Sequence, residues 1–179
     1  MENTIKTAIL GGGCFWCTEA IFEDLKGVIS VIPGYAGGDM NNPTYKDICN
    51  CGTGHAEVIK IAFDPCQITY KTLLEVFFAT HDPTTPHQQG NDVGEQYRSM
   101  IFFTDDSQRK DAQDFMNKIN GSGNFHKPIV TQIQPIEKFY TAEEYHHKYF
   151  DKNPGQPYCS SVIAPKIKKF REKYSYLLR

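Results

Sequence analysis

Gly11-Gly12-Gly13-Cys14-Phe15-Trp16-Cys17 joins an apolar, β-type run at residues 7–10 to a helix-type run at residues 18–25. The three glycines lack a Cβ atom, so they allow a sharp turn and a close approach of the backbone to a ligand. The turn places the first cysteine at or near the N-terminus of the helix, where free N–H groups and the helix dipole favour an anion. We therefore expect a reactive thiol of lowered pKa at Cys14, with the two aromatic residues that follow it forming a wall beside it.

The Cys14-x-x-Cys17 pair also has other interpretations. The same spacing is typical of metal knuckles and of dithiol oxidoreductases, and an isolated cysteine is often only a small buried hydrophobic residue. Zinc binding would chiefly use Cys14, Cys17, Cys49 and Cys51. The histidines of the chain add no recognised set of metal ligands, so we expect no metal.

The composition indicates one globular domain. The chain has 179 residues, of which 19 are basic and 21 acidic, and its net charge is −2. This balance argues against a nucleic acid or an anionic membrane as a partner bound through bulk charge. No segment approaches the ~20 apolar residues of a membrane span, and residues 1–4 lack the layout of a signal peptide. We therefore expect a cytoplasmic protein whose six cysteines are reduced at rest.

Strand and helix patterns alternate along the chain without repeats or linkers. Apolar alternation and turn residues predict strands at residues 4–10, 28–32, 55–63, 98–104 and 129–136. Helical periodicity predicts helices at residues 16–26, 69–80, 105–120, 142–150 and 165–178. Pro33-Gly34 is expected to end the second strand, and residues 35–51 and 82–96 are expected to form long functional loops.

These elements predict a fold of the α+β class. We expect a single-domain, two-layer α/β sandwich with a mixed sheet of four to six strands and a ferredoxin-like core. The domain is expected to span residues 1–179. Within it, residues 151–179 would form a C-terminal loop and helix that carry Cys159.

Three motifs follow one another in a distinctive order. They are Gly13-Cys14-Phe15-Trp16, the run TGHAE at residues 53–57 and the run GNDVGEQYRS at residues 90–99. Together they resemble peptide methionine sulfoxide reductase of class A, and the resemblance covers about residues 7–170. It implies that Cys14 is the nucleophile that attacks the sulfoxide sulfur. It also implies that Glu57 is the buried acid that protonates the sulfoxide oxygen.

The resemblance implies roles for the residues around these two. Phe15 and Trp16 would hold the S-methyl group of the substrate, because a methyl offers no polar handle and aromatic faces can grip it. Tyr45 and Tyr97 would hydrogen-bond the sulfoxide oxygen, and Asp92 would be a supporting acid of the pocket. A buried glutamate of raised pKa suits proton donation at neutral pH.

Attack by Cys14 would release methionine and leave a sulfenic acid, which condenses with a second thiol. Cys159 resembles the family's recycling cysteine and lies in a loop that contains proline and glycine. Cys17 is the alternative, since the commoner pattern has a glycine after the tryptophan. We favour Cys159, because pairing Cys14 with Cys17 would pull the intervening aromatic residues away from the substrate.

We therefore predict a peptide-methionine (S)-S-oxide reductase that acts on free and protein-bound methionine S-sulfoxide and repairs oxidised proteins. The resemblance implies thioredoxin as the reductant and neither an organic cofactor nor a metal, and we expect a monomer. Two alternative functions make different predictions. A general dithiol oxidoreductase would depend on Cys17 and little on Glu57, and a zinc module would lose its fold with a chelator.

Overall fold

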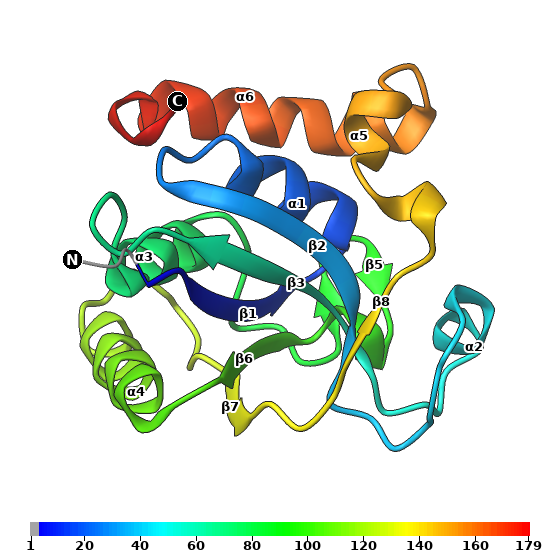
Figure 1. The fold of residues 1–179 in the computed structure, drawn as a ribbon, viewed down its shortest axis with the longest axis horizontal. Helices are drawn as coiled ribbons and strands as arrows, with labels where there is room; N and C mark the ends of the chain where they lie inside the picture. The colour runs from blue at the N-terminus through cyan, green and yellow to red at the C-terminus, as the bar shows by residue number, and fades with distance from the viewer. Residues whose placement is uncertain (1–3) are drawn as a thin grey trace.

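A curled six-stranded sheet forms the centre of the computed structural model, which describes residues 4–179 (Figure 1). The strands follow the order β7-β6-β1-β3-β2-β8 across the sheet. β6 and β7 are parallel and the other pairings in the sheet are antiparallel, so the predicted mixed sheet is confirmed. Residues 1–3 lie outside the described residues. They belong to the predicted domain and to the segment that is predicted not to be a signal peptide. The strands are β1 (Lys6–Gly12), β2 (Val28–Ala36), β3 (Ala56–Phe63), β6 (Ser99–Phe103), β7 (Gln132–Pro135) and β8 (Phe139–Thr141), and a separate hairpin pairs β4 (Gln88–Gln89) with β5 (Asp92–Val93).

Four helices begin close to where the sequence predicts them, at Phe15, Tyr70, Asp106 and Ala164. The side chain of Thr69 accepts the N–H of Thr72 at the start of α3, and that of Asp105 accepts the N–H of Gln108 at the start of α4. Such caps satisfy N–H groups that have no partner within the helix. Among residues 4–179, none of the helices has the length and apolar character needed to cross a membrane. The α-helices are α1 (Phe15–Glu23), α2 (Tyr45–Cys49), α3 (Tyr70–Ala79), α4 (Asp106–Asn120), α5 (Tyr149–Lys152) and α6 (Ala164–Lys173).

Two cores lie on opposite faces of the sheet, because successive side chains of a strand point to opposite sides. Leu10 of β1 and Ile61 of β3 belong to the larger core, which α1 and α3 cover. Ile9 and Val58 belong to a smaller core on the other face, against which Phe139 packs. Glu57 on β3, and the turn after β1 that carries Cys14, are therefore held by strands that are buried on both faces.

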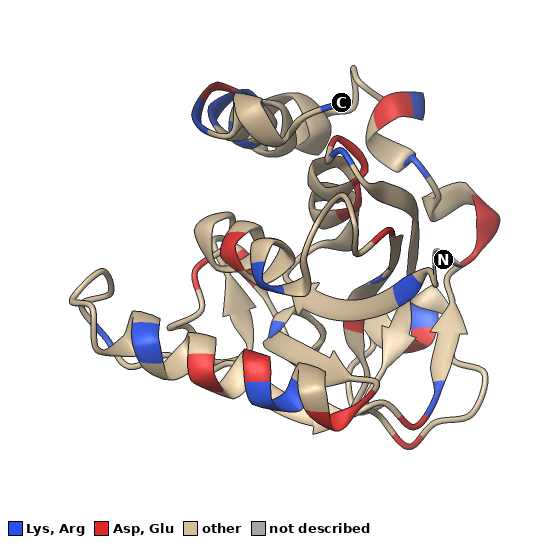
Figure 2. Ribbon diagram, turned by 60° about the vertical axis from the view of Figure 1, so that its left-hand side comes forward, with Lys and Arg blue, Asp and Glu red and all other residues tan. Residues whose placement is uncertain are grey.

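The C-terminal helix adds a further layer to the predicted two-layer arrangement. α6 packs on α1, on the side of α1 that faces away from the sheet (Figure 1). Ile167 and Phe170 carry this contact into the larger core. Figure 2 shows mainly basic residues along α6, whereas acidic and basic residues are mixed along α4.

Pro33 does not end the second strand, so this prediction is wrong. β2 continues to Ala36 and pairs Pro33 with Ile59 of β3. The carbonyl of Pro33 accepts the N–H of Ala142 at 2.9 Å, on the side of the strand that faces β8. The N–H that proline lacks would point to the same side, so the ring interrupts no hydrogen bond to β3.

The predicted helix at residues 142–150 is also wrong. The chain forms the unpredicted β8, then the 3-10 turn η2 (Glu144–His146) and, after a break, the single turn α5. The break is at Lys148, whose φ of +53° is incompatible with a continuous right-handed helix. Its N–H donates to both carboxylate oxygens of the buried Glu19, each at 3.0 Å. This contact is distant in sequence, and it overrides the local helical pattern.

Candidate active site

The turn between β1 and α1 carries Cys14, as the sequence predicts. Gly13 has φ +93°, and a Cβ atom placed there would lie 2.6 Å from Cγ of Gln89, so the turn requires glycine. Cys14 is the N-cap residue of α1. The thiol therefore stands beside the free N–H groups of the first helical turn.

The pKa of Cys14 lies well above its ordinary value, so the predicted lowering is wrong. Burial is the largest cause, negative charge on Glu57 adds to it, and the N–H of Trp16 acts in the opposite direction. Part of the side chain opens to a pocket, but protein surrounds the sulfur on most sides. The lost hydration of a thiolate outweighs the stabilisation that the helix terminus offers. Cys14 is therefore a protonated thiol at rest.

Glu57 lies on β3 opposite Tyr35 of β2. Its side chain is 1% exposed, and its Oε2 accepts the N–H of Phe15 at 3.0 Å. Burial raises the pKa of Glu57 to about 8; the Phe15 N–H opposes this shift and charge on Asp92 adds to it. The carboxyl is therefore protonated at neutral pH and can donate a proton, as the sequence predicts.

A pocket of about 250 Å³ connects Cys14 and Glu57. It gathers every residue that the sequence assigns to catalysis or substrate binding, together with two that it does not. One thiol, one neutral carboxyl, one further acid and three phenols thus share one small space with Phe15 and Trp16. The lining residues are Cys14, Phe15, Trp16, Tyr45, Glu57, Asp92, Tyr97, Gln156 and Tyr158.

Two tyrosines reach the pocket from short helical turns. Tyr45 is the first residue of α2, which replaces part of the predicted loop at residues 35–51 because Thr44 and Asp47 form a capping box. Tyr97 ends the 3-10 turn η1 (Glu95–Tyr97). Burial raises the pKa of both phenols, and the charge of Glu57 adds to the shift. Both hydroxyls therefore keep their protons and can donate hydrogen bonds.

The aromatic wall is fixed by residues that precede and form α5. Trp16 stacks on Tyr149 with 3.7 Å between ring centroids and 9° between planes. Its Nε1 donates to Nδ1 of His146 at 2.9 Å. Phe15 is buried, with its ring centroid 5.0 Å from that of His146. The segment whose structure the sequence mispredicts is thus the one that holds the wall in place.

A family model described as peptide methionine sulfoxide reductase matches residues 6–177. The chain belongs to this family. The peptide methionine sulfoxide reductase MsrA of Sulfolobus acidocaldarius is 53% identical over 170 residues, which cover 95% of this chain and 96% of that protein. The protein of the same name from Deinococcus radiodurans is 50% identical, over 97% of this chain and 84% of its own length.

Solved structures agree with the family. The reduced form of Mxr1 from Saccharomyces cerevisiae matches with a TM-score of 0.81 at 36% identity, over 89% of this chain and 91% of that one. Mxr1 in complex with Trx2 matches with a TM-score of 0.58 at 29% identity, over 82% of this chain and 87% of that one. As a member of the peptide methionine sulfoxide reductase family, the chain is an oxidoreductase that reduces methionine sulfoxide with a thiol, which confirms the predicted activity.

Two residues of the reductase pocket escaped the sequence analysis. The hydroxyl of Tyr158 donates to Oδ2 of Asp92 and also interacts with the Cys14 thiol. Oε1 of Gln156 accepts the N–H of Cys159 at 2.9 Å. Both residues lie in the loop that carries Cys159, the predicted recycling cysteine. The position of Tyr158 directly before Cys159 was the sequence signal that could have identified it.

The candidate resolving thiols of the reductase are both buried. Cys17, in the first turn of α1, is 5% exposed, and Cys159, at the start of the π-helical turn η3 (Cys159–Ile163), is 0% exposed. Cys159 does not line the pocket that contains Cys14 and Glu57. Within the described range 4–179, no group of three or more His, Cys, Asp or Glu side chains is placed to hold a metal ion.

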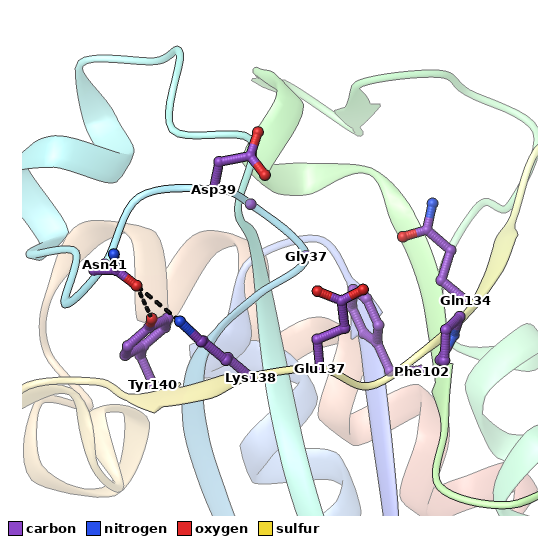
Figure 3. A pocket seen from close by; sticks show the side chains of 10 residues that line it. Gly37, Asp39, Asn41, Phe102, Gln134, Glu137, Lys138 and Tyr140 are labelled. Carbon is purple, nitrogen blue, oxygen red and sulfur yellow. Dashed lines mark hydrogen bonds between the residues drawn. The ribbon is translucent and has the colours of Figure 1, made fainter.

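A separate hollow of about 420 Å³ lies between the loop after β2 and the chain that joins β7 to β8 (Figure 3). In it, Oδ1 of Asn41 accepts hydrogen bonds from Nζ of Lys138 and from the hydroxyl of Tyr140, each at 3.0 Å. His55 packs edge-on against Tyr140, and its Nε2 lies 2.7 Å from the carbonyl oxygen of Met40. These contacts anchor the loop that leads to α2, so they position Tyr45, one of the phenols of the reductase pocket.

Proposed function

We propose that the sulfur of Cys14 attacks the sulfur of methionine S-sulfoxide while Glu57 transfers its proton to the sulfoxide oxygen. The buried carboxyl of Glu57 is the observation that carries this proposal, because its pKa of about 8 keeps it protonated beside the thiol. Sulfoxide sulfur is a poor electrophile until its oxygen is protonated or strongly hydrogen-bonded. A positioned acid therefore supplies what this reaction lacks in water.

The protonated state of Glu57 favours the reaction in two ways, because it supplies a proton and makes Cys14 easier to ionise. Negative charge on Glu57 raises the pKa of Cys14, so the neutral carboxyl leaves the thiol easier to ionise. In the reaction, the Cys14 thiol loses its proton, which replaces the one that Glu57 gives up, and the Cys14 sulfur bonds to the sulfoxide sulfur. The oxygen then transfers to the Cys14 sulfur as this S–S bond and the S–O bond of the sulfoxide break, and methionine leaves. The oxygen remains on Cys14 as a sulfenic acid, so the thiol is oxidised by two electrons and the sulfoxide is reduced by two.

The remaining pocket residues would orient the substrate. The hydroxyls of Tyr45 and Tyr97 donate to the sulfoxide oxygen and stabilise the negative charge that it carries before protonation is complete. Phe15 and Trp16 hold the S-methyl group against aromatic faces. Asp92 keeps the hydroxyl of Tyr158 directed at the thiol side of the pocket, as their hydrogen bond supports.

Replacing one phenol is expected to lower kcat/KM about tenfold, and replacing both is expected to lower it about 10²- to 10³-fold. Tyr45→Phe and Tyr97→Phe each remove one hydrogen bond to the sulfoxide oxygen and leave the ring in place. The matched control is Tyr176→Phe, at a side chain 71% exposed, which should stay within about twofold of the unaltered protein. Steady-state reduction of a methionine sulfoxide peptide measures all four variants, and a double variant no slower than the single ones would contradict the shared role.

The sulfenic acid then condenses with a second thiol, and we propose that thioredoxin reduces the resulting disulfide. The crystal structure of the similar protein Mxr1 in complex with Trx2 supports this reductant. The resemblance favours Cys159 as the second thiol, with Cys17 as the alternative. Reduction by exchange returns both cysteines of the pair to thiols and transfers the disulfide to the partner.

We further propose that the chain acts as a monomer in the cytoplasm and as one catalytic domain over residues 1–179. Its six cysteines are free thiols, which suits a reducing compartment. A ferredoxin-like core is also part of the proposal. The order β6-β1-β3-β2, with α1 between β1 and β2 and α3 between β3 and β6, supports this description.

Single-turnover reduction of the two sulfoxide epimers tests the proposed function. Without added reductant, the S epimer is expected to yield about one methionine per chain and the R epimer essentially none, since different enzymes handle the two. Liquid chromatography of the quenched reaction measures methionine. Equal yields from both epimers would remove the proposed stereoselectivity, and no methionine from either would remove the proposed chemistry.

A further inference from the structure

A second cavity, of about 210 Å³, also borders Cys14. Its lining includes Cys14, Cys17, Asp92, Tyr158 and Lys166, and it does not include the aromatic wall. Cys14 therefore borders two spaces, one that holds the proposed substrate site and one that holds a second thiol. Cys159 lines neither of these two cavities.

The backbone already holds Cys17 close to Cys14. The N–H of Cys17 donates to the carbonyl of Cys14 at 3.2 Å, so the two residues occupy one helical turn. Cys14 is the N-cap residue and Cys17 the third residue of α1, and neighbours this close on a helix surface need only a local shift to reach the separation of about 3.8 Å between Cβ atoms that a disulfide requires. A bond between Cys14 and the fully buried Cys159 requires a larger rearrangement, because Cys159 reaches neither cavity beside Cys14.

The aromatic residues between the two cysteines do not oppose closure. Phe15 and Trp16 line the pocket that contains Glu57, whereas Cys17 lines the other cavity. Trp16 is also held independently by its stacking on Tyr149. The sequence-based objection, that pairing Cys14 with Cys17 would displace the aromatic wall, is therefore removed by the directions of these side chains.

Lys166 is the charged group best placed to activate Cys17. It lies on α6, is half-buried and interacts with the Cys17 thiol, whereas Lys168 and Lys169 of the same helix are exposed. Burial raises the pKa of Cys17, the positive charge of Lys166 opposes this, and Asp92 adds to the increase. A half-buried ammonium beside a buried thiol is the feature that favours a thiolate during attack.

We propose that Cys17, held against Lys166 in the cavity it shares with Cys14, closes the first disulfide on the Cys14 sulfenic acid. This inference rests on the proposed function, which supplies the sulfenic acid. The sulfur of Cys17 attacks the sulfur of Cys14, the S–O bond breaks, and the proton of Cys17 joins the departing hydroxide to give water. Lys166 acts through Cys17 as a positioning residue, and Cys159 enters afterwards by thiol–disulfide exchange.

Rapid-quench single turnover of the full chain with methionine S-sulfoxide tests this order. Methionine release, dimedone trapping of the sulfenic acid and mass mapping of disulfides follow the same samples. In the unaltered protein the earliest bridge is expected to be Cys14–Cys17, also in the Cys159→Ser variant. In Cys17→Ser the sulfenic acid of Cys14 should remain trappable by dimedone at least tenfold longer.

Lys166→Met is expected to lower the ratio of disulfide closure rate to methionine release rate at least tenfold. It should also move the pH dependence of closure upward, because a cation that supports the Cys17 thiolate is lost. Lys166→Arg should restore most of the ratio, and Lys168→Met, which removes an exposed lysine of the same helix, should not change it. The ionisable groups that face Cys17 are Cys14, Asp92 and Lys166.

Each contrary outcome overturns one proposal. A first bridge between Cys14 and Cys159, or a closure ratio unaffected by Lys166→Met, overturns the role of Cys17 and Lys166 and leaves the reductase chemistry intact. Absence of methionine in the unaltered protein overturns the proposed function itself. If Lys166→Met fails to fold, the earliest bridge mapped in the unaltered protein still decides the order.

Discussion

Cys14→Ser is expected to abolish formation of methionine from methionine sulfoxide, with a loss of at least about 10⁴-fold in kcat. A serine hydroxyl is a far weaker nucleophile toward sulfur, and its oxygen has no oxidation state that corresponds to a sulfenic acid. The substitution changes one atom in a half-buried side chain, so the fold is expected to survive. Methionine formation with excess thiol reductant measures the loss, and circular dichroism checks the fold.

Cys66→Ser is the matched control for this variant. Cys66 is an exposed cysteine in the turn before α3, and it lines neither of the two cavities described beside Cys14. Its activity should stay within about twofold of the unaltered protein. Residual turnover of Cys14→Ser above about 1% would mean that another thiol attacks the sulfoxide, and the assignment of Cys14 would then be wrong.

Glu57→Gln is expected to lower kcat about 10²- to 10³-fold at pH 7, the range of a lost general acid. Glutamine still accepts the N–H of Phe15 but has no proton to transfer. The unaltered protein should itself lose activity as the pH rises through about 8, where Glu57 loses its proton. In Glu57→Gln this alkaline decline should be absent. Single-turnover rates between pH 6 and pH 9.5 measure both effects.

The same variant should be more stable than the unaltered protein at high pH. The pKa of Glu57 is about 8 in the folded state and near 4.5 when unfolded, so the folded state binds more protons between these values. The unaltered protein therefore loses stability as the pH rises from about 4.5 to 8, and glutamine does not. We expect a gain on the order of 1–3 kcal/mol in the free energy of unfolding at pH 9, measured by urea denaturation.

Glu75→Gln controls for the change of residue type, since Glu75 is an exposed glutamate on α3. It should alter neither the pH–rate profile nor the stability by more than about 0.5 kcal/mol. A Glu57→Gln variant with normal activity and an unchanged alkaline decline would show that another group protonates the sulfoxide oxygen. Gain of stability together with loss of activity would instead be typical of a residue kept for chemistry at the expense of the fold.

Local sequence signals determined most of the secondary structure. The strand–glycine–helix pattern around Gly13 correctly predicts the turn and the place of Cys14 at the N-cap of α1. Thr69 and Asp105 cap the helices that the periodicity predicts, because a cap acts within three or four residues of itself. The family resemblance likewise depends only on the motifs and on their order along the chain.

Long-range contacts decided the elements that the sequence mispredicts. Glu19 accepts the N–H of Lys148, and this contact breaks the helix expected there. Pairing with β3 and the hydrogen bond from Ala142 to the carbonyl of Pro33 extend β2 beyond Pro33. No local pattern encodes such partners, since they lie 100 or more residues apart or on neighbouring strands. The same holds for the stacking of Trp16 on Tyr149.

The sequence by itself determined the fold class, the family and the residue types of the reactive pocket. Only the tertiary structure decided their electrostatics and their neighbours. Burial makes Glu57 an acid of pKa about 8 and raises the pKa of Cys14, against the lowering that its helix terminus alone suggests. Packing of α6 on α1 brings Lys166 to Cys17. Charge and reactivity depend on hydration and on distances through space, which the order of residues along the chain does not specify.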